Sequence, residues 1–479
     1  MYLNERNDVI IVGAGIAGLT VAIAISLAMP KRKIPLVDSS ANAGGSFSSL
    51  EVDEGCFFDR GIHLIPHPRE SLFEFLFTPE NGFGADYWNV LSFPRSDRSG
   101  NFINGVFNFD SSLININNLG CQDAAIIRAE LDVLLPKSQD SCRSVGEYID
   151  SNFGARMLSL LDNVILAKFG RKAYELNPNL LNLYPLKRII VDGQVATEAL
   201  LSNSRYASRI GYPRQEKLPP SLAANPLNYY PKTAGIKSYI DRMIAFLRNR
   251  GVDIFFESQV VELLSGSNSN VTGLTIRRRD GSELKFTQPQ IIWSSPAFFL
   301  HRLLTDAGIT IPAGIVSQRP ERVIDYVHFC TERPLVGMDV FYIYPFTPDH
   351  FFRLTNYASF TKHPMGNAYT LELIRAFDSD PLSLLHSRSA VVKFLAAIGR
   401  KHVAVTHCWS DPYRAPVPTA TLDNIAGLGT GAQLKAATRS VHSNSLAGIE
   451  LFGSAATGQY MVSKDVFSAA AKFAKEMQK

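Results

Sequence analysis

The 479-residue sequence predicts an α/β protein that opens with a βαβ unit. Residues 9–13 form an apolar strand, residues 13–18 read Gly-Ala-Gly-Ile-Ala-Gly, and residues 16–28 continue as an apolar helix. Hydrophobic residues make up 46% of the chain and charged residues 19%, so a large core can form, and the length allows two or three domains. This composition excludes a disordered or fibrous protein.

Each glycine between the strand and the helix has a physical role. Gly13 permits a tight turn, Gly15 lets a pyrophosphate approach the backbone, and Gly18 lets the helix pack closely on the strand. The helix begins at Ile16 and Ala17, where free N–H groups and a partial positive charge face the phosphates. The motif therefore predicts a bound dinucleotide.

A carboxylate ends the second strand of this unit. Residues 34–37 are apolar, and Asp38 follows them, twenty residues after Gly18. A carboxylate at this position accepts hydrogen bonds from ribose hydroxyls. The same negative charge disfavours the 2′-phosphate of NADP, and NAD and FAD both remain compatible with this unit.

A second glycine pair points to FAD by resemblance. Gly44 and Gly45, followed by Ser46, resemble the loop along the FAD pyrophosphate in glutathione-reductase-type flavoproteins. Residues 55–63 read Gly-Cys-Phe-Phe-Asp-Arg-Gly-Ile-His, which resembles the G-x-x-x-D-x-G-x-H turn of the amine oxidase, protoporphyrinogen oxidase and UDP-galactopyranose mutase superfamily. The resemblance implies FAD as cofactor and adds these residues to its site: Ser39, Gly61, Ile62 and His63.

Central segments continue the resemblance. Residues 228–235 and an amphipathic helix at residues 236–249 are similar to the segment that returns the chain to the FAD domain in this superfamily. By the same resemblance, Val260 contacts adenine through its backbone. Ser294 stands in residues 290–296, which resemble a buried strand beneath that domain.

The C-terminal segment resembles the part that completes the FAD site. Residues 448–453 form a strand that closes on Gly453, Tyr460 and Met461 follow, and an Ala-rich helix covers about residues 466–475. The resemblance implies that this helix points its N-terminus at the pyrimidine edge of the flavin, and that Tyr460 faces the ring. No cysteine lies near the position that monoamine oxidases use for a covalent bond, so we expect non-covalent FAD.

Three residues are candidates for catalysis: His63, Arg353 and Tyr460. The resemblance implies that His63 lies over the isoalloxazine ring, whereas the alternative is a loop histidine bonded to backbone. Arg353 can hold a carboxylate or phosphate through two hydrogen bonds, or it can pair with Glu372. Arg414 is a further candidate for an anionic substrate. Candidates for an aromatic substrate pocket are Tyr344, Tyr357 and Trp409.

Other classes of site and partner receive little support. The five cysteines are scattered, and prolines break the spacing of His63 and His67, so no metal is predicted. The cysteine pattern fits a reducing, cytoplasmic compartment. Residues 9–29 carry no charge, but their glycines favour strand, turn and helix over a membrane span. A net charge of +4 is too small to predict nucleic acid as the main partner. The resemblance implies a small-molecule substrate, possibly anionic or a sugar nucleotide.

The resemblance implies a discontinuous Rossmann-type FAD-binding domain, similar to that of glutathione reductase, and a second α+β substrate domain. The first is expected from residues 1–65, 230–296 and 407–479, and the second from residues 66–229 and 297–406. The expected function is an FAD-dependent oxidoreductase that removes hydride from a C–N or C–C bond. The alternatives are a sugar-nucleotide mutase without net redox and a flavin-stabilised binding protein.

Overall fold

The computed structural model describes most of the chain. The described residues are 2–3, 9–68, 70–78, 83–84, 86–219, 226–266, 271–287, 289–309, 320–335, 340–417, 449–452 and 463–478. Gly453, Tyr460 and Met461 lie outside them.

A five-stranded parallel sheet unites the two ends of the chain. Its order is β13-β3-β2-β17-β23. The strands are β2 (Val9–Val12), β3 (Pro35–Val37), β13 (Asp253–Phe255), β17 (Gln290–Trp293) and β23 (Ile449–Leu451). β2 and β3 are buried throughout, as expected for a parallel sheet covered on both faces. The predicted discontinuous α/β fold is confirmed, because N-terminal, central and C-terminal strands share this sheet.

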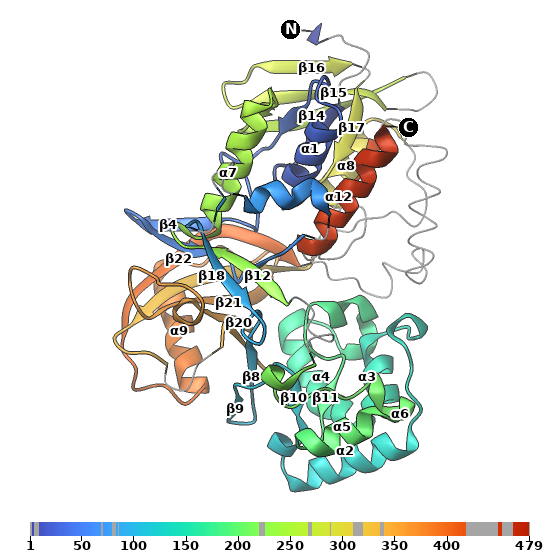
Figure 1. Cartoon of the computed structure of the whole chain (residues 1–479), viewed down its shortest axis with the longest axis vertical. Coiled ribbons are helices and arrows are strands. Elements are labelled where there is room, and N and C mark those ends of the chain that lie inside the picture. The colour runs from blue at the N-terminus through green and yellow to red at the C-terminus, as the bar shows by residue number, and fades with distance from the viewer. Residues whose placement is uncertain are drawn as a thin grey trace.

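Different layers cover the two faces of the five-stranded sheet. One face packs against the helices α1 (Ile16–Ala28), α7 (Gly235–Asn249) and α12 (Ser463–Met477). The other packs against α8 (Ala297–Asp306) and a sheet of β1 (Tyr2–Leu3), β16 (Glu283–Thr287), β15 (Val271–Arg278) and β14 (Ser258–Ser265). Figure 1 shows α1 and α12 side by side, in the part of the molecule that holds both termini.

A seven-stranded mixed sheet forms the second body of the molecule, in the order β22-β18-β21-β20-β19-β8-β9. The strands are β8 (Ser99–Ile103), β9 (Val106–Asn108), β18 (Arg322–Thr331), β19 (Tyr342–Pro345), β20 (Phe351–Asn356), β21 (Ala368–Ala376) and β22 (Val405–Val417). Neighbours are antiparallel except β19 and β8.

Helices cover both faces of the seven-stranded sheet (Figure 1). One face packs against a helical cluster that contains α2 (Cys121–Val133), α3 (Val145–Phe153), α4 (Ala155–Phe169), α5 (Gln194–Leu201) and α6 (Ser204–Ala207). The other face packs against α9 (Leu384–Ala397). Short 3-10 helices are η1 (Ser71–Phe77), η3 (Ile116–Leu119), η4 (Gln139–Ser141), η5 (Ala173–Glu175), η6 (Pro178–Asn182), η7 (Gln215–Lys217) and η9 (Tyr357–Ser359).

Small sheets link the two bodies. A three-stranded sheet contains β6 (Ile65–Pro66), β12 (Leu227–Pro231) and β7 (Trp88–Ser92). The hairpin of β4 (Ser49–Asp53) and β5 (Cys56–Asp59) lies against α7, and β10 (Ile114–Asn115) pairs with β11 (Ile189–Ile190). β5 also contacts β21 of the seven-stranded sheet, so this hairpin touches both bodies.

Two expected segment boundaries differ from the structure. β22 pairs with β18, so residues 407–417 belong to the seven-stranded sheet and not to the predicted cofactor domain. α8 packs against β14, so the segment that starts at residue 297 continues the body built around the five-stranded sheet. The reason in both cases is long-range packing, which the local sequence pattern does not encode.

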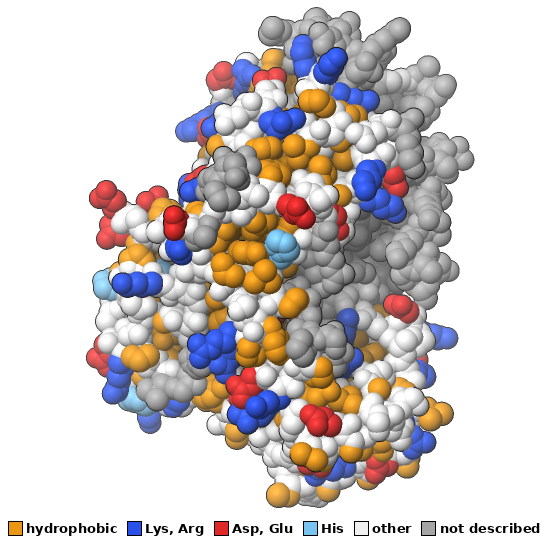
Figure 2. Space-filling model, viewed as in Figure 1, with side chains coloured by type: hydrophobic (Ala, Val, Ile, Leu, Met, Phe, Trp, Pro, Cys, Tyr) orange, Lys and Arg blue, Asp and Glu red, His pale blue; other side chains and the backbone are white. Residues whose placement is uncertain are grey.

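The surface in Figure 2 mixes both charge signs. Lysine and arginine side chains are scattered among acidic ones on this face, and no large basic area forms there. No helix among the described residues combines the length and the apolar character needed to cross a bilayer.

Candidate functional site

The three glycines of the first turn have different surroundings. Gly13 has φ +106°, and a Cβ there would lie 2.7 Å from the Ser294 hydroxyl. A Cβ on Gly18 would lie 1.8 Å from the carbonyl oxygen of Gly13, so only glycine allows this helix-to-strand contact. Beside Gly15, the only atom of the described residues that a Cβ would meet within 4 Å is the Gly44 carbonyl oxygen, at 3.9 Å. The space that a phosphate would occupy is therefore open.

The first turn of α1 offers backbone donors at this open space. Gly15 is the N-cap, and no side chain caps the helix. The first N–H groups of a helix have no partner inside it, and they carry the positive end of the helix dipole. Ile16 and Ala17, the first two helical residues, are only half-buried. The residues present thus fit an anionic diphosphate.

Asp38 follows β3 and, at the edge of the site, bonds the turn that follows β2. Its Oδ2 accepts the Ala14 N–H at 2.6 Å, and its Oδ1 accepts the Ser40 N–H at 2.7 Å. The Asp38 carbonyl oxygen accepts the Ser258 N–H at 2.9 Å, which brings the start of β14, with Val260, beside it. A carboxylate has about four acceptor positions, so this half-exposed side chain retains capacity for ribose hydroxyls.

The second glycine pair lies directly against the first turn. The Gly44 N–H donates to the Ala14 carbonyl at 2.8 Å, and Gly44 forms a β-bridge with Gly15. Gly44 and Gly45 have φ +103° and +60°, values that L side chains rarely adopt. The two glycine segments therefore form one continuous backbone surface.

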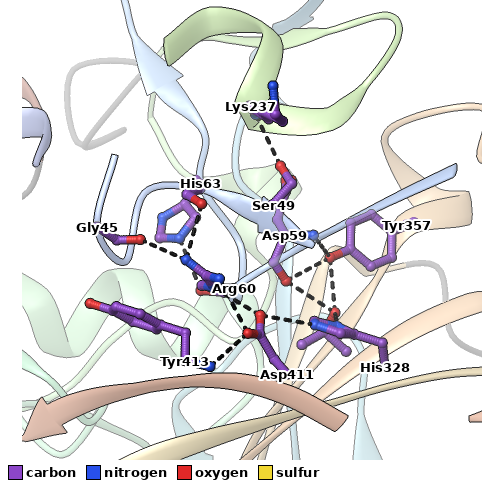
Figure 3. Close-up of polar contacts among 12 residues, drawn as sticks. Gly45, Ser49, Asp59, Arg60, His63, Lys237, His328, Tyr357, Asp411 and Tyr413 are labelled. Carbon is purple, nitrogen blue, oxygen red and sulfur yellow. Dashed lines mark hydrogen bonds and ion pairs between the residues drawn. The ribbon is translucent and has the colours of Figure 1, made fainter. Parts of the chain in front are cut away.

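Arg60 fastens this second loop to the seven-stranded sheet (Figure 3). Its Nη1 donates to the Gly45 carbonyl at 3.1 Å and to the Ser48 hydroxyl at 3.0 Å. Its Nε and Nη2 donate to the two carboxylate oxygens of Asp411, on β22, at 2.8 and 3.2 Å. The guanidinium also stacks over Tyr413, 4.2 Å from the ring centre. A single side chain thus links the Gly44–Gly45 loop and β22.

The ion pair continues into a fully buried histidine. His328 Nε2 lies 3.5 Å from Asp411 Oδ2, and His328 Nδ1 lies 2.9 Å from the Thr370 hydroxyl. Burial lowers the pKa of His328, which favours the neutral ring. Burial alone would raise the pKa of Asp411, but hydrogen bonds from His328 and Arg60, with the charge of Arg60, hold it at about 2. An ionised carboxylate therefore faces Arg60.

A second buried carboxylate, Asp59, fixes the hairpin to α7. It accepts hydrogen bonds from the Ser49 hydroxyl at 2.6 Å, the Tyr230 hydroxyl at 2.7 Å and the Ile236 N–H at 3.0 Å. Burial raises the pKa of Asp59 to about 6, against these three hydrogen bonds, which lower it. Its role is structural, because these donors surround an almost fully buried side chain.

His63 lies at the end of the same segment. Its Nε2 is 2.9 Å from the Arg60 carbonyl oxygen, and its ring centre is 4.2 Å from that of Phe47. Desolvation, together with the positive charge of Arg353, lowers the pKa of His63 to about 3. The imidazole is therefore neutral at physiological pH, and its Nε2–H donates to backbone, as in the alternative that the sequence left open.

Arg353 is paired with Glu372. Two hydrogen bonds, of 2.6 and 3.0 Å, join the guanidinium to the carboxylate, and the pair packs against Gly61, whose φ is +89°. Because both partners are largely buried, the pair shapes the wall behind the His63 turn. Whether a substrate also reaches Arg353 remains a prediction.

Three of the proposed substrate residues have structural roles. Tyr357 is almost fully buried, and its hydroxyl bonds the backbone of Asp59 and the Thr370 hydroxyl. Arg414 uses its donors on Asp325 and on backbone carbonyls of residues 376, 377 and 379. Tyr344 is buried in the aromatic packing below the sheet. These contacts give the three residues structural partners, and whether a substrate also reaches any of them remains a prediction.

The remaining residues that the sequence assigned to the site differ in their burial and in their contacts. Trp409 is half-buried and stacks on His407. Ser294 donates to the carbonyl oxygens of Val12 and Gly13, so it supports the turn from behind. Ser39 is exposed beside Asp38, whereas Ser46 and Ile62 are half-buried. Among the described residues, no cluster of His, Cys, Asp or Glu is arranged to hold a metal ion.

Several residues of this site were not identified from the sequence: Asp59, Arg60, His328, Asp411 and Tyr413. Asp59 and Arg60 stand inside the recognised turn motif, so that motif could have indicated them. Asp411 lies 351 positions from Arg60, and its neighbours in the chain carry no signal of the contact.

Comparisons with known proteins agree with this geometry. A family model described as an NAD(P)-binding Rossmann-like domain matches residues 11–77. A 4,4′-diapolycopene oxygenase of Methylomonas sp is 34% identical over 136 residues, which are 28% of this chain and 24% of that protein. The match therefore spans about a quarter of the relative's length.

Solved structures resemble the whole chain. Reduced UDP-galactopyranose mutase superposes with a TM-score of 0.70 at 16% identity, over 99% of this chain and 94% of that one. A putative protoporphyrinogen oxidase from Exiguobacterium sp. 255-15 gives 0.63 at 15% identity, over 99% of both chains. A putrescine oxidase variant gives 0.58 at 13% identity, over 100% of both. The predicted resemblance to this superfamily is confirmed at the level of the fold.

Proposed function

We propose that this protein is an FAD-dependent oxidoreductase. The observation that carries the proposal is the open backbone surface at Gly15, which is bounded by the α1 N-terminus, Asp38 and the Gly44 turn. This arrangement matches the diphosphate and ribose of a dinucleotide. The shared fold with mutase and oxidase structures, together with the second glycine loop, favours FAD over NAD.

The chain's own residues would bind and orient the cofactor. Backbone N–H groups at Ile16 and Ala17 would hold the diphosphate, and Asp38 would accept ribose hydroxyls. His63, neutral because its pKa is low and with its Nε2–H donated to the Arg60 carbonyl, would line the reacting end of the site without adding charge. FAD, when bound, supplies the hydride acceptor. The prediction that it is held without a covalent bond is part of this proposal.

A sugar-nucleotide mutase is the second candidate. The observation in its favour is the TM-score of 0.70 with a UDP-galactopyranose mutase over almost the entire chain. Against it, Arg353 is held by Glu372 instead of being exposed for a diphosphate substrate. A shared fold does not fix the reaction, so chemistry must decide between the two.

The cofactor can be tested directly. We expect the purified protein to be yellow, with absorbance at about 450 nm from the flavin chromophore. Acid precipitation should release FAD into the supernatant if the cofactor is bound without a covalent link. Colour retained in the pellet would contradict non-covalent binding, and a colourless protein that binds NAD would contradict FAD itself.

The reaction class can be separated by anaerobic mixing. Bleaching of the flavin by an amine, a porphyrinogen or a diapolycopene-type hydrocarbon would support hydride removal and identify the substrate class. Turnover of a sugar nucleotide that appears only after dithionite reduction would support the mutase. The hydrocarbon belongs in the panel because the Methylomonas relative is named for that substrate.

His63→Ala tests the role of the turn. We expect FAD to stay bound, because His63 contacts the Arg60 backbone and Phe47, and turnover to fall at least tenfold, about 1.4 kcal/mol in barrier. The turnover rate and the flavin content are the measurements. His67→Ala, an exposed histidine four residues later, serves as the control. Unchanged turnover in His63→Ala would remove this residue from the mechanism.

A further inference from the structure

The geometry points to Arg60 and Asp411 as positioning residues that couple the Gly44–Gly45 loop to the seven-stranded sheet. The inference rests on the FAD binding proposed above and concerns groups that the glycine motifs do not include. Figure 3 shows Arg60 between the Gly45 carbonyl and the Asp411 carboxylate. Neither side chain belongs to the backbone surface at Gly15, so both would act through the loop.

The first step of the argument is the direction of the Gly45 carbonyl. Arg60 Nη1 donates to this oxygen at 3.1 Å and to the Ser48 hydroxyl at 3.0 Å. A carbonyl oxygen facing a diphosphate would repel it, whereas one held toward a guanidinium does not. Gly45 and Gly44 adopt positive φ, so their backbone needs an external hold to keep one orientation.

The second step is the rigidity of the anchor. Asp411 has no exposed side-chain surface, and it binds the Arg60 fork through both oxygens while also receiving the Tyr413 N–H at 2.8 Å. A two-bond guanidinium–carboxylate pair fixes angle as well as distance. Buried His328 lies behind the carboxylate, 3.5 Å away. The loop is thus attached to the interior of the sheet and not to a mobile surface group.

The third step is a second contact from the same strand. The Tyr413 ring lies under the Arg60 guanidinium at 4.2 Å, and its hydroxyl lies beside the glycine loop. A Cβ placed on Gly45 would lie 4.0 Å from that hydroxyl. Two neighbouring positions of β22 therefore hold the loop. Binding at the Gly15 surface should, by linkage, stabilise the β22 contact, and loss of that contact should weaken binding.

The test compares the Arg60–Asp411 pair with the Arg375–Asp325 pair. Both carboxylates lie on strands of the seven-stranded sheet. Arg375 donates to the buried Asp325 at 3.0 Å, and Asp325 keeps Arg414 when Arg375 is removed. In the same way, Asp411 keeps its contact with His328 when Arg60 is removed. Among the described residues Arg375 makes no hydrogen bond to the glycine loop, so Arg375→Gln controls for the loss of a half-buried guanidinium.

The measurement is FAD release from the diluted holoprotein, followed by flavin fluorescence. We expect Arg60→Gln to raise the dissociation constant at least tenfold and Arg375→Gln to change it less than twofold, although both substitutions lower the melting temperature. Asp411→Asn should weaken binding as well, and the double variant should bind no worse than Arg60→Gln. Equal dissociation constants in Arg60→Gln and Arg375→Gln would overturn the inference.

Two further measurements remain decisive if Arg60→Gln does not fold. Tyr413→Phe removes only the hydroxyl at the loop, and we expect it to raise the dissociation constant at least threefold. In the wild type, FAD should slow hydrogen exchange in β22 more than in α9. The helix α9 packs on the face of the seven-stranded sheet opposite the helical cluster. Unchanged affinity in Tyr413→Phe, or equal protection of β22 and α9, contradicts the coupling. A wild type that binds no FAD contradicts the proposed function instead.

Discussion

The glycines of the motif at residues 13–18 are present for different physical reasons. At Gly18 a side chain would overlap the Gly13 carbonyl, so the constraint lies in the folded chain itself. At Gly15 the backbone has φ −69°, and in the part of the chain that the structure describes the added carbon would meet one atom within 4 Å. Gly15 is therefore dispensable for folding but not for a ligand that must touch the backbone.

This difference predicts opposite outcomes for two alanine substitutions. Gly15→Ala should leave the melting temperature of the apoprotein nearly unchanged and weaken FAD binding at least tenfold, because the methyl group occupies the phosphate's space. Gly18→Ala should destabilise the protein by several kcal/mol, as overpacked positions do, with or without FAD. Melting curves and flavin release separate the two effects. Equal loss of stability in both variants would show that the space at Gly15 is not a ligand site.

At the scale of elements, α7 begins in an unusual way. Its N-cap is Ala234, which has φ +58° and provides no side-chain cap. The Asp59 carboxylate and the Ser49 hydroxyl instead accept the N–H groups of Ile236 and Lys237. The cap is therefore supplied by the β4–β5 hairpin, which ties the hairpin to the start of the helix.

Ala234→Gly should stabilise the protein by about 1 kcal/mol, because glycine adopts positive φ without strain. The free energy of unfolding in denaturant is the measurement. Ala199→Gly is the control, since Ala199 is exposed inside α5 and its replacement should cost about 1 kcal/mol. A loss of stability in Ala234→Gly would mean that the methyl group packs more favourably than its backbone strain costs.

The same cap predicts a pH dependence. Between about pH 4 and pH 6 the unfolded chain carries an ionised Asp59, whereas the folded chain keeps the proton, because burial raises the pKa of Asp59 to about 6. Unfolding then releases a proton, so stability falls as pH rises, by roughly 3 kcal/mol over this interval. Asp59→Asn should remove that contribution.

The experiment measures how the free energy of unfolding changes with pH in the wild type and in Asp59→Asn. The contributions of all other titrating groups cancel in the difference between the two proteins. The wild type should lose stability relative to Asp59→Asn from pH 4 to pH 6. Glu51→Gln, an exposed position in the same hairpin, should follow the wild type. Parallel curves for the wild type and Asp59→Asn would show that Asp59 is already ionised in the folded protein.

At the scale of the molecule, the nucleotide surface is assembled from distant segments. The first βαβ unit provides the turn, the second glycine loop lies against it, and β22 of the other body holds that loop through Arg60. A ligand that contacts the assembled surface binds the folded chain and not the unfolded one. Binding must therefore stabilise the whole fold.

Removal of FAD should accordingly lower the melting temperature of the entire protein. At a free concentration one hundred times the dissociation constant, the ligand contributes about 2.7 kcal/mol. Thermal unfolding of holoprotein, apoprotein and reconstituted protein is the measurement, with NAD at equal concentration as the control. An equal shift with NAD would contradict specificity for FAD, and no shift with either would contradict binding at this surface.

The sequence by itself determined the elements whose causes are local. The helix expected at residues 16–28 is α1. Glycine φ angles, apolar runs and helix periodicity act over a few residues, so they can be identified without the fold. The carboxylate after β3 was predictable for the same reason.

Only the tertiary structure decided which distant groups meet. Arg353 faces Glu372 and Arg414 faces Asp325, so two candidate substrate cations proved to be parts of buried or half-buried pairs. Arg60 reaches Asp411 because β22 joins the seven-stranded sheet, against the expected boundary. The physical reason is that strand register and sheet order set these contacts, and both depend on the packing energy of the whole chain rather than on the neighbouring residues.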